Sequence, residues 1–100
     1  MKNPGVYILE SEVNHRYYVG STDDVERRLT EHNSGFVIST KSSRPWALKK
    51  FIKCGSLPES RKSEYKLKNY KSRIILEKVI ESGILPWKYN KLDNSGGPLA

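Results

Sequence analysis

Two short runs of β-branched and aromatic residues, separated by a mostly polar stretch, constrain the fold of this chain more than any other feature. Residues 5–10 read Gly-Val-Tyr-Ile-Leu-Glu and residues 16–20 read Arg-Tyr-Tyr-Val-Gly, with residues 11–15 between them. Runs of this length and composition, bounded by turn-forming residues, are typical of strands. They predict an antiparallel β-hairpin with a loop longer than the tight two-residue type.

A helix is predicted directly after the hairpin, over about residues 23–34. Asp23 and Glu26 stand three residues apart, as in a capping box, so Asp23 is expected to accept a backbone N–H at the helix start. Apolar residues recur at helical spacing within the segment, and an Asn-Ser-Gly sequence supplies its end. The polar residues 37–44 that follow are expected to form a loop.

The second half of the chain predicts one more strand and two more helices. A strand with one wet face is expected at residues 46–52, where large apolar residues and lysines mix. Start signals at Ser56 predict a helix that continues to about Tyr70. A further helix is predicted over residues 72–82, apolar at helical spacing and ended by Gly83. The expected order of elements is therefore β-β-α-β-α-α.

These elements fit one small domain. A chain of 100 residues falls within the usual range for a single domain with one modest core. We expect residues 1–92 to form this domain and the glycine-containing residues 93–100 to form a loose C-terminal tail. Between them, residues 85–90 are expected to be a short extended piece that packs two aromatic side chains onto the body.

The positive charge is concentrated in the second half of the chain. Residues 1–40 hold four basic and six acidic residues, a net charge of −2, whereas residues 41–100 hold fourteen basic and five acidic residues, a net charge of +9. Such asymmetry favours a polyanionic partner. A lysine-rich surface kept for solubility explains the charge equally well, and charge alone does not separate DNA from RNA.

No segment of the sequence indicates a membrane or an oxidising compartment. The longest apolar run is far shorter than the roughly 20 residues needed to cross a bilayer, and the first residues lack the apolar stretch of a signal peptide. Cys54 is the only cysteine, so neither an internal disulfide nor a second thiol ligand exists. We expect a cytoplasmic protein without membrane contact, in which Cys54 is a small, partly buried side chain.

Four side chains from the first half can meet on one surface. Tyr7 and Tyr18 become neighbours if the two runs pair as antiparallel strands, and the predicted helix begins close by. Arg28 and His32 are four residues apart, so they project from one face of that helix. Phosphodiester cleavage uses such groups, a proton acceptor for the attacking water and cationic donors for the charge that develops on phosphate oxygens. The arrangement permits a phosphate site without requiring one.

Two triplets, a helical arginine and histidine, and a downstream glutamate follow one another along the chain: Gly5-Val6-Tyr7, Tyr18-Val19-Gly20, Arg28, His32 and Glu64. In these residues the chain resembles the GIY-YIG nuclease family over about residues 4–70, and in particular its short single-domain bacterial members. The flanking sequences Ser21-Thr22 and Ser39-Thr40 resemble these members as well. Valine replaces isoleucine in both triplets, which keeps a β-branched residue. After Lys68 the match is weaker, because serine and basic residues stand one place later than expected.

The resemblance implies an α+β fold, a small three-stranded antiparallel sheet flanked by helices, and metal-assisted hydrolysis of a phosphodiester. Glu64 is then the sole protein ligand of a divalent cation, Mg²⁺ with Mn²⁺ as the alternative. A hard cation that keeps most of its waters suits a lone carboxylate. Tyr7 is implied as the general base, although a free phenol has a pKa of about 10. Positive charge beside it would favour the phenolate.

The remaining implied roles concern the phosphate and the DNA. Tyr18 holds Tyr7 or the attacking water, Arg28 binds the scissile phosphate, and His32 relays a proton or donates to the phosphate. Asn90 is a further catalytic candidate, since some family members use an asparagine near the end of the domain. The predicted nucleic-acid contacts are basic residues around this site: Arg27, Lys41, Arg44, Arg61, Lys68 and Lys71.

Each assignment has a structural alternative. The two strand tyrosines are common core residues, and the helical arginine and histidine can belong to a solvated face. Glu64 can be a surface ion-pair partner of Lys68 or Arg61. His15 is expected to be exposed in the hairpin loop. Three aromatic residues favour packing over base stacking: Tyr17, Trp46 and Trp87.

Three functions stay open at this point. The first is an endonuclease that acts on DNA, in repair, recombination or the processing of branched DNA, with a protein partner left undetermined. The second is a catalytically weak nucleic-acid-binding module of the same fold. The third is an interaction domain that binds no nucleic acid. The complete set of five motif residues favours the first, and the small size of the chain favours limited sequence specificity.

Overall fold

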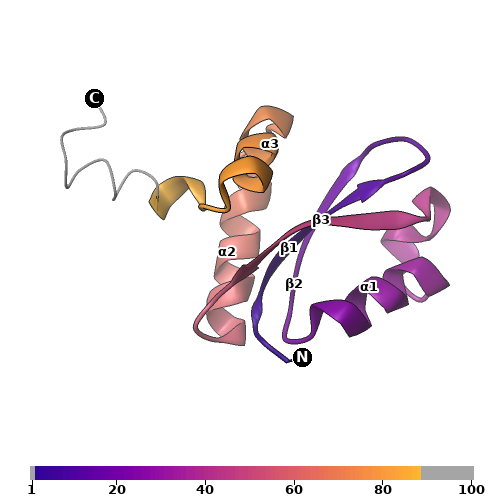
Figure 1. The fold of residues 1–100 in the computed structure, drawn as a ribbon, viewed down its shortest axis with the longest axis horizontal. Helices are drawn as coiled ribbons and strands as arrows, with labels where there is room; N and C mark the ends of the chain where they lie inside the picture. The colour runs from indigo at the N-terminus through magenta and orange to yellow at the C-terminus, as the bar shows by residue number, and fades with distance from the viewer. Residues whose placement is uncertain (1, 89–100) are drawn as a thin grey trace.

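The computed structural model describes residues 2–88, and its centre is the predicted hairpin. Strands β1 (Gly5–Ser11) and β2 (Tyr17–Thr22) pair antiparallel. Strand β3 (Trp46–Lys53) pairs antiparallel with the other side of β1, which gives the strand order β2-β1-β3 (Figure 1). The α+β class and the three-stranded antiparallel sheet are therefore confirmed.

The helices occur in the predicted order, with one short addition. Helix α1 spans Val25–Ser34, α2 spans Leu57–Asn69 and α3 spans Arg73–Ser82. A 3-10 helix, η1 (Ile38–Ser43), stands where a loop was predicted. The loop prediction was wrong because a residue outside the segment, in β3, helps to hold this turn: the Trp46 indole N–H donates to the carbonyl of Thr40 at 2.9 Å.

The start of α1 also differs from the prediction. Asp24, rather than Asp23, is the N-cap, and its carboxylate accepts from the backbone N–H of Arg27 at 3.1 Å. Asp23 instead forms an ion pair with the Arg27 side chain at 3.5 Å. The predicted capping box was one residue out of register, because two adjacent aspartates offer the same local signal.

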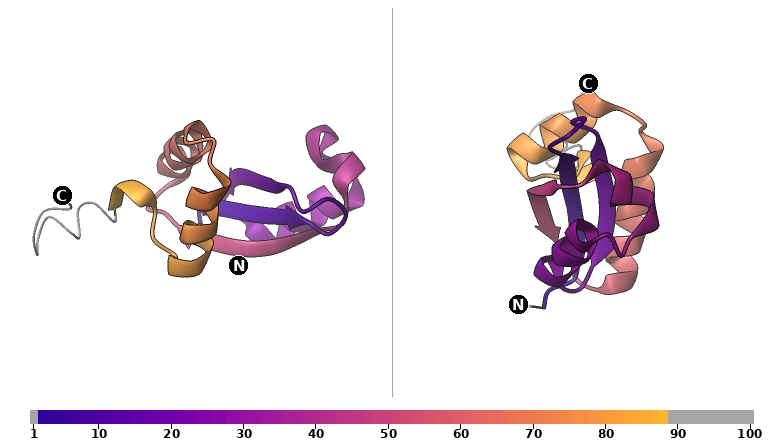
Figure 2. Two further views of the ribbon diagram at one scale, coloured as in Figure 1. Left: turned by 90° about the horizontal axis from the view of Figure 1, so that it is seen from above. Right: turned by 90° about the vertical axis from the view of Figure 1, so that its right-hand side faces the viewer.

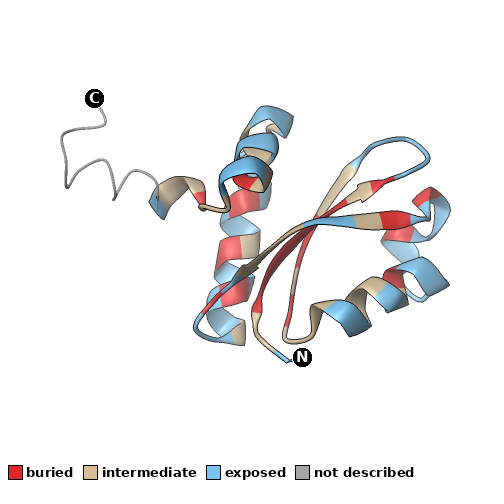
Figure 3. Cartoon of the chain, in the orientation of Figure 1, coloured by how far each residue is buried: buried red, intermediate tan, exposed pale blue. Residues whose placement is uncertain are grey.

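The sheet separates two apolar clusters. One face of the hairpin packs Val6 and Ile8 against Leu67 of α2 and Val79 of α3. The other face carries Tyr7, Leu9 and Trp46, against which residues of α1 pack. Figures 1 and 2 show α2 and α3 gathered on one side of the sheet and α1 with η1 on the other, and Figure 3 shows the buried residues concentrated along the central strand β1, with further buried positions on α2. Successive residues of β1 therefore pack against different helices on the two faces of the sheet.

The remaining predictions concern the chain ends and the cysteine. Residues 86–88 are helical, so the prediction of an extended piece was wrong there, although Trp87 packs on the core as expected. Asn90 and the predicted tail lie outside the described residues. Cys54 is buried, with 8% of its surface exposed. Within residues 2–88, no helix combines the length and apolar character required to cross a bilayer.

Candidate active site

A glycine in β2 makes room for the central tyrosine. The register places Tyr7 opposite Gly20 and Leu9 opposite Tyr18, so the two tyrosines are diagonal neighbours on one face, with ring centroids 6.3 Å apart. A Cβ atom on Gly20 would overlap the ring and hydroxyl of Tyr7. The glycine of the second triplet therefore lets the phenol lie flat against the strand.

A buried hydrogen-bond chain runs from the sheet to η1. The Tyr7 hydroxyl lies 2.8 Å from Nε2 of His32, and Nδ1 of His32 lies 2.8 Å from the hydroxyl of Thr40. The Thr40 hydroxyl in turn donates to the carbonyl of Val37 at 3.3 Å. Because Thr40 uses its proton on Val37, it accepts from Nδ1–H, and Nε2 is left to accept the Tyr7 proton.

Burial fixes the protonation of this chain. Tyr7 and His32 are almost wholly buried, at 1% and 0% exposure. Desolvation raises the pKa of Tyr7 to about 12, and the nearby Arg28 guanidinium opposes this only in part. Desolvation, reinforced by the charge of Arg28, lowers the pKa of His32 to about 4. At neutral pH the pair is therefore a phenol donating to a neutral imidazole.

Arg28 lies beside the Tyr7–His32 pair and is partly exposed to solvent. Its Nη1 atom contacts Oε1 of Glu31 at 2.8 Å, and its side chain is one-third exposed. The pKa of Arg28 is raised, first by the hydrogen bond to Glu31 and further by its interaction with Tyr7. A fixed guanidinium with a partly open face is suited to an anionic ligand. The predicted pairing of Arg28 and His32 on one helix face is present, with His32 inward.

Glu64 reaches the same site from α2, which packs beside the edge strand β2. Its Oε1 atom accepts a hydrogen bond from the Ser21 hydroxyl at 2.6 Å, and its Oε2 atom lies 2.6 Å from Nζ of Lys68. The Lys68 ammonium also lies 5.5 Å from the centre of the Tyr18 ring. The carboxylate is close enough to Tyr7 to contribute to the rise of its pKa. The ion pair foreseen as an alternative role for Glu64 is thus part of the site.

Glu64 is the carboxylate at this site that could bind a divalent cation. Among residues 2–88, no three histidine, cysteine, aspartate or glutamate side chains gather as a metal-binding group. The side chain of Glu64 is 22% exposed, and its oxygens are hard ligands already held by a hydroxyl and an ammonium group. Such a donor set would fit a hydrated cation of the Mg²⁺ type. It does not fit a soft metal that needs nitrogen or sulfur ligands.

The predicted nucleic-acid contacts all lie on the surface. The structure describes each of them as exposed: Arg27, Lys41, Arg44, Arg61, Lys68 and Lys71. Arg27 forms ion pairs along α1, with Asp23 and with Glu31 at 3.4 Å. Lys68 is the member of this set that contacts Glu64 directly.

Two site residues had no role assigned from the sequence. Ser21 positions Glu64, and Thr40 fixes the tautomer of His32. Both belong to flanking sequences that resemble short family members, which was the one available signal. Their roles depend on contacts across 43 and 8 positions of the chain, and no local pattern encodes these contacts. Of the aromatic residues expected to pack, Trp46 is the most buried, at 3% exposure.

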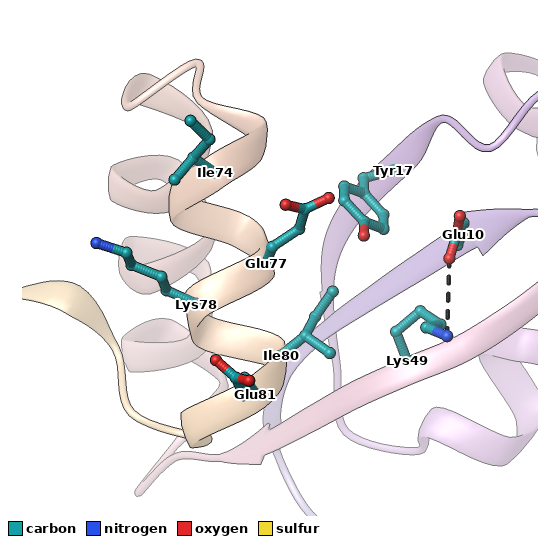
Figure 4. A pocket seen from close by; sticks show the side chains of 8 residues that line it. All are labelled: Glu10, Tyr17, Lys49, Ile74, Glu77, Lys78, Ile80 and Glu81. Atoms are coloured by element: carbon teal, nitrogen blue, oxygen red, sulfur yellow. Dashed lines mark ion pairs between the residues drawn. The ribbon is translucent and has the colours of Figure 1, made fainter.

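A separate cavity of about 480 Å³ lies between the other face of the sheet and α3. Figure 4 shows Glu10 of β1 paired with Lys49 of β3, whose charged atoms are 3.7 Å apart, and Glu77 of α3 pointing toward Tyr17; Glu81 of α3 also lines the cavity. None of the predicted site residues that the structure describes lines this cavity. Its mixed charges give no preference for an anionic ligand, so the site around Tyr7 is the candidate.

The chain is similar to known proteins over most of its length. A family model described as the GIY-YIG catalytic domain matches residues 3–78, a range that includes all five motif residues. Over 50 residues the chain is 46% identical to a protein of Meyerozyma guilliermondii named structure-specific endonuclease subunit SLX1. The matched part is 44% of this chain and 17% of that protein, so the chain spans a small part of its relative. No solved structure shows significant similarity to the chain.

Proposed function

The chain belongs to the GIY-YIG family, and on this premise we propose that it is an endonuclease that hydrolyses phosphodiester bonds in DNA with the help of a divalent cation. The observation that carries the proposal is the convergence of a buried Tyr7–His32 pair, the open guanidinium of Arg28 and the carboxylate of Glu64. These groups provide a proton path, an anion site and a cation site at one place.

Arg28 and Glu64 hold the substrate phosphate in this proposal. Arg28 donates to a non-bridging oxygen, and its hydrogen bond to Glu31 keeps the guanidinium plane in place. Glu64 would hold the divalent cation, which would supply positive charge to the substrate phosphate. The Ser21 hydroxyl donates to Oε1 of Glu64 and leaves Oε2 for other partners. In the absence of a cation, the ammonium group of Lys68 neutralises the charge of this carboxylate.

Tyr7 and His32 move the proton of the attacking water. With the pKa of Tyr7 at about 12 and that of His32 at about 4, a resident phenolate is not the base in the free protein. We infer a relay instead: the Tyr7 oxygen takes a proton from the water while its own proton passes to Nε2 of His32. The phosphate anion beside the site stabilises the imidazolium that results. The water oxygen then bonds to phosphorus as the bond to the leaving oxygen breaks; the leaving oxygen takes a proton from solvent, and His32 releases its extra proton to solvent through Tyr7.

Branched or otherwise distorted DNA is the proposed substrate. The name of the similar protein describes a structure-specific endonuclease subunit, and this chain resembles 17% of it. The catalytic fold leaves little surface with which to read bases. A role in DNA repair or recombination would follow from such a substrate. Mg²⁺ is the proposed ion, because a lone carboxylate suits a cation that keeps its water shell.

The nuclease proposal is tested by cleavage of end-labelled DNA. The purified chain is incubated with duplex, single-stranded and splayed-arm DNA in Mg²⁺, in Mn²⁺ and in EDTA. We expect cleavage with either cation, none in EDTA, and preference for the splayed-arm form. No cleavage of any substrate over a wide range of cation and protein concentrations would contradict the proposal.

A second candidate function is a nucleic-acid-binding module with little turnover. The ion pair that Lys68 makes with Oε2 of Glu64, at 2.6 Å, is the observation that favours it, because it occupies the oxygen needed for the cation. Replacing Lys68 by methionine removes this competitor. Cleavage that appears only in Lys68→Met would identify the parent as a binding module, whereas cleavage by the parent favours the nuclease.

A further inference from the structure

Two large apolar side chains stand out in solvent on the segment between α1 and η1. Phe36 is 78% exposed and Ile38 is 90% exposed, the highest values among the large apolar residues that the structure describes. A single exposed apolar residue needs no explanation. Two of them on the same short segment, separated by one residue, present a local apolar surface to water.

This segment is held firmly by the backbone around it. The N–H of Phe36 donates to the carbonyl of Glu31 at 3.1 Å, and that of Gly35 donates to His32 at 3.3 Å. On the far side of Ile38, the N–H of Thr40 donates to Val37 at 3.1 Å. The exposed pair is thus presented by fixed backbone, so little ordering entropy opposes its contact with a ligand.

Cationic side chains flank the apolar pair. Arg44 lies against Gly35, where an added Cβ would come within 2.6 Å of its Nη1 atom, and Lys41 lies beside it. The Nε–H of Arg44 donates to the carbonyl of Lys41 at 2.9 Å, which fixes the direction of the guanidinium. An apolar surface bordered by fixed positive charge is complementary to a nucleic acid, which offers base faces beside phosphates.

The pair is close to the proposed catalytic groups. Thr40 contacts the ring of His32 at 2.8 Å, and Ile38 precedes Thr40 by two residues. Two residues span at most about 7 Å, whereas consecutive base pairs along one strand are about 3.4 Å apart. A base on Ile38 or Phe36 would therefore be within a few nucleotides of a phosphate held by Arg28.

We propose that Phe36 and Ile38 form a wedge that packs against unstacked bases beside the scissile phosphate, with Lys41 and Arg44 on the adjoining phosphates. The inference rests on the proposed function and deepens it, because a wedge selects DNA in which bases are already unpaired. In paired duplex the bases are stacked on each other, and separating them costs free energy that a junction does not demand.

Binding in EDTA tests the wedge separately from hydrolysis. The full chain is titrated with a splayed-arm DNA and with a duplex of the same length, each carrying 2-aminopurine at the position of the branch point. We expect tighter binding to the splayed-arm DNA and a fluorescence change at its branch. Phe36→Ala and Ile38→Ala are each expected to weaken binding to splayed-arm DNA by roughly 10-fold, as for loss of one base-stacking contact, with little change for the duplex.

Ile74→Ala is the matched control, because Ile74 is 65% exposed on α3 and borders the cavity on the other face. It should leave binding to both DNAs unchanged. Parent-like preference in both wedge variants, equal weakening on both DNAs, or a parent that binds no DNA would overturn the wedge. A parent that shows the wedge effect in EDTA but never cleaves with Mg²⁺ or Mn²⁺ would contradict the nuclease proposal alone.

Discussion

The hydrogen bond between Tyr7 and His32 sets the chemistry available at the residue scale. Both side chains are buried and neutral, and each satisfies the hydrogen-bonding capacity of the other. The sequence predicted that the two belong to one site but assigned the base role to Tyr7. The raised pKa of Tyr7, with His32 2.8 Å behind it, favours a relay over a resident phenolate.

Removal of the Tyr7 hydroxyl tests this relay. Tyr7→Phe keeps the ring and removes the donor to a buried imidazole, so we expect a loss of about 1–3 kcal/mol in the free energy of unfolding. Cleavage is expected to fall by about 10²–10⁴-fold, the usual range for general acid–base groups. Tyr17→Phe, on the opposite face of β2, is the control in single-turnover assays. Equal cleavage rates for Tyr7→Phe and the parent would refute the relay.

The buried imidazole should also make stability depend on pH. The pKa of His32 lies at about 4, below its ordinary value of 6.5, so the unfolded chain takes up a proton first as pH falls. The stability conferred by neutral His32 is therefore complete above pH 6.5 and is lost between pH 6.5 and 4. The loss is about 3 kcal/mol, from 1.36 kcal/mol per pH unit.

Urea unfolding of the parent and of His32→Gln at several pH values measures this effect. The variant is expected to be less stable near neutral pH, but its stability should fall less steeply between pH 6.5 and 4. Parallel pH profiles for the two proteins would show that His32 is not the group responsible.

At the scale of elements, the sheet register positions the tyrosine side chains of the proposed active site. The sequence predicted the hairpin and the order of helices because periodicity and end signals are local. It predicted a loop where η1 forms and placed the first helix cap one residue early, because η1 depends on the Trp46–Thr40 contact and the cap on a choice between neighbouring aspartates. The position of Glu64 beside Ser21 likewise depends on how α2 packs against β2.

Gly20 is the position at which this register can be tested. In Gly20→Ala the new methyl group overlaps Tyr7, so the ring has to shift, at a cost of about 1–3 kcal/mol in stability. A displacement of about 1 Å can lower a rate by about 100-fold, and we expect a loss of cleavage of that order. Gly55→Ala is the control, because its Cβ would meet only the flexible Glu59 carboxylate. Normal cleavage by a folded Gly20→Ala protein would exclude this role for the glycine.

At the scale of the whole molecule, we expect charge to govern the proposed encounter with DNA. The net charge of +7 comes from the second half of the chain, while four of the five proposed catalytic groups, Tyr7, Tyr18, Arg28 and His32, belong to the first half. Folding brings the two halves together at the edge of β2, where α2 packs. This arrangement places the basic residue Lys68 of α2 near the neutral Tyr7–His32 pair.

The dependence of DNA binding on salt measures this surface. If the six predicted basic residues contact phosphates, affinity should fall by about 10³-fold between 50 and 200 mM salt. Fluorescence anisotropy in EDTA measures the affinity of the parent and of Arg44→Ala for DNA at several salt concentrations. The slope of the logarithm of affinity against the logarithm of salt concentration should be smaller in magnitude by about one for the variant. An affinity independent of salt would contradict phosphate contact by these residues.

The most direct test of the proposed active site is cleavage of splayed-arm DNA by Glu64→Gln beside Glu81→Gln in Mg²⁺. The first substitution keeps the shape of the side chain and removes the charge required for the cation, whereas Glu81 lines the cavity on the other face of the sheet. We predict that Glu64→Gln binds DNA but loses cleavage by at least about 100-fold, the effect of removing one strong electrostatic contribution, and that Glu81→Gln cleaves like the parent. Undiminished cleavage by a folded Glu64→Gln protein would contradict the assignment of the active site.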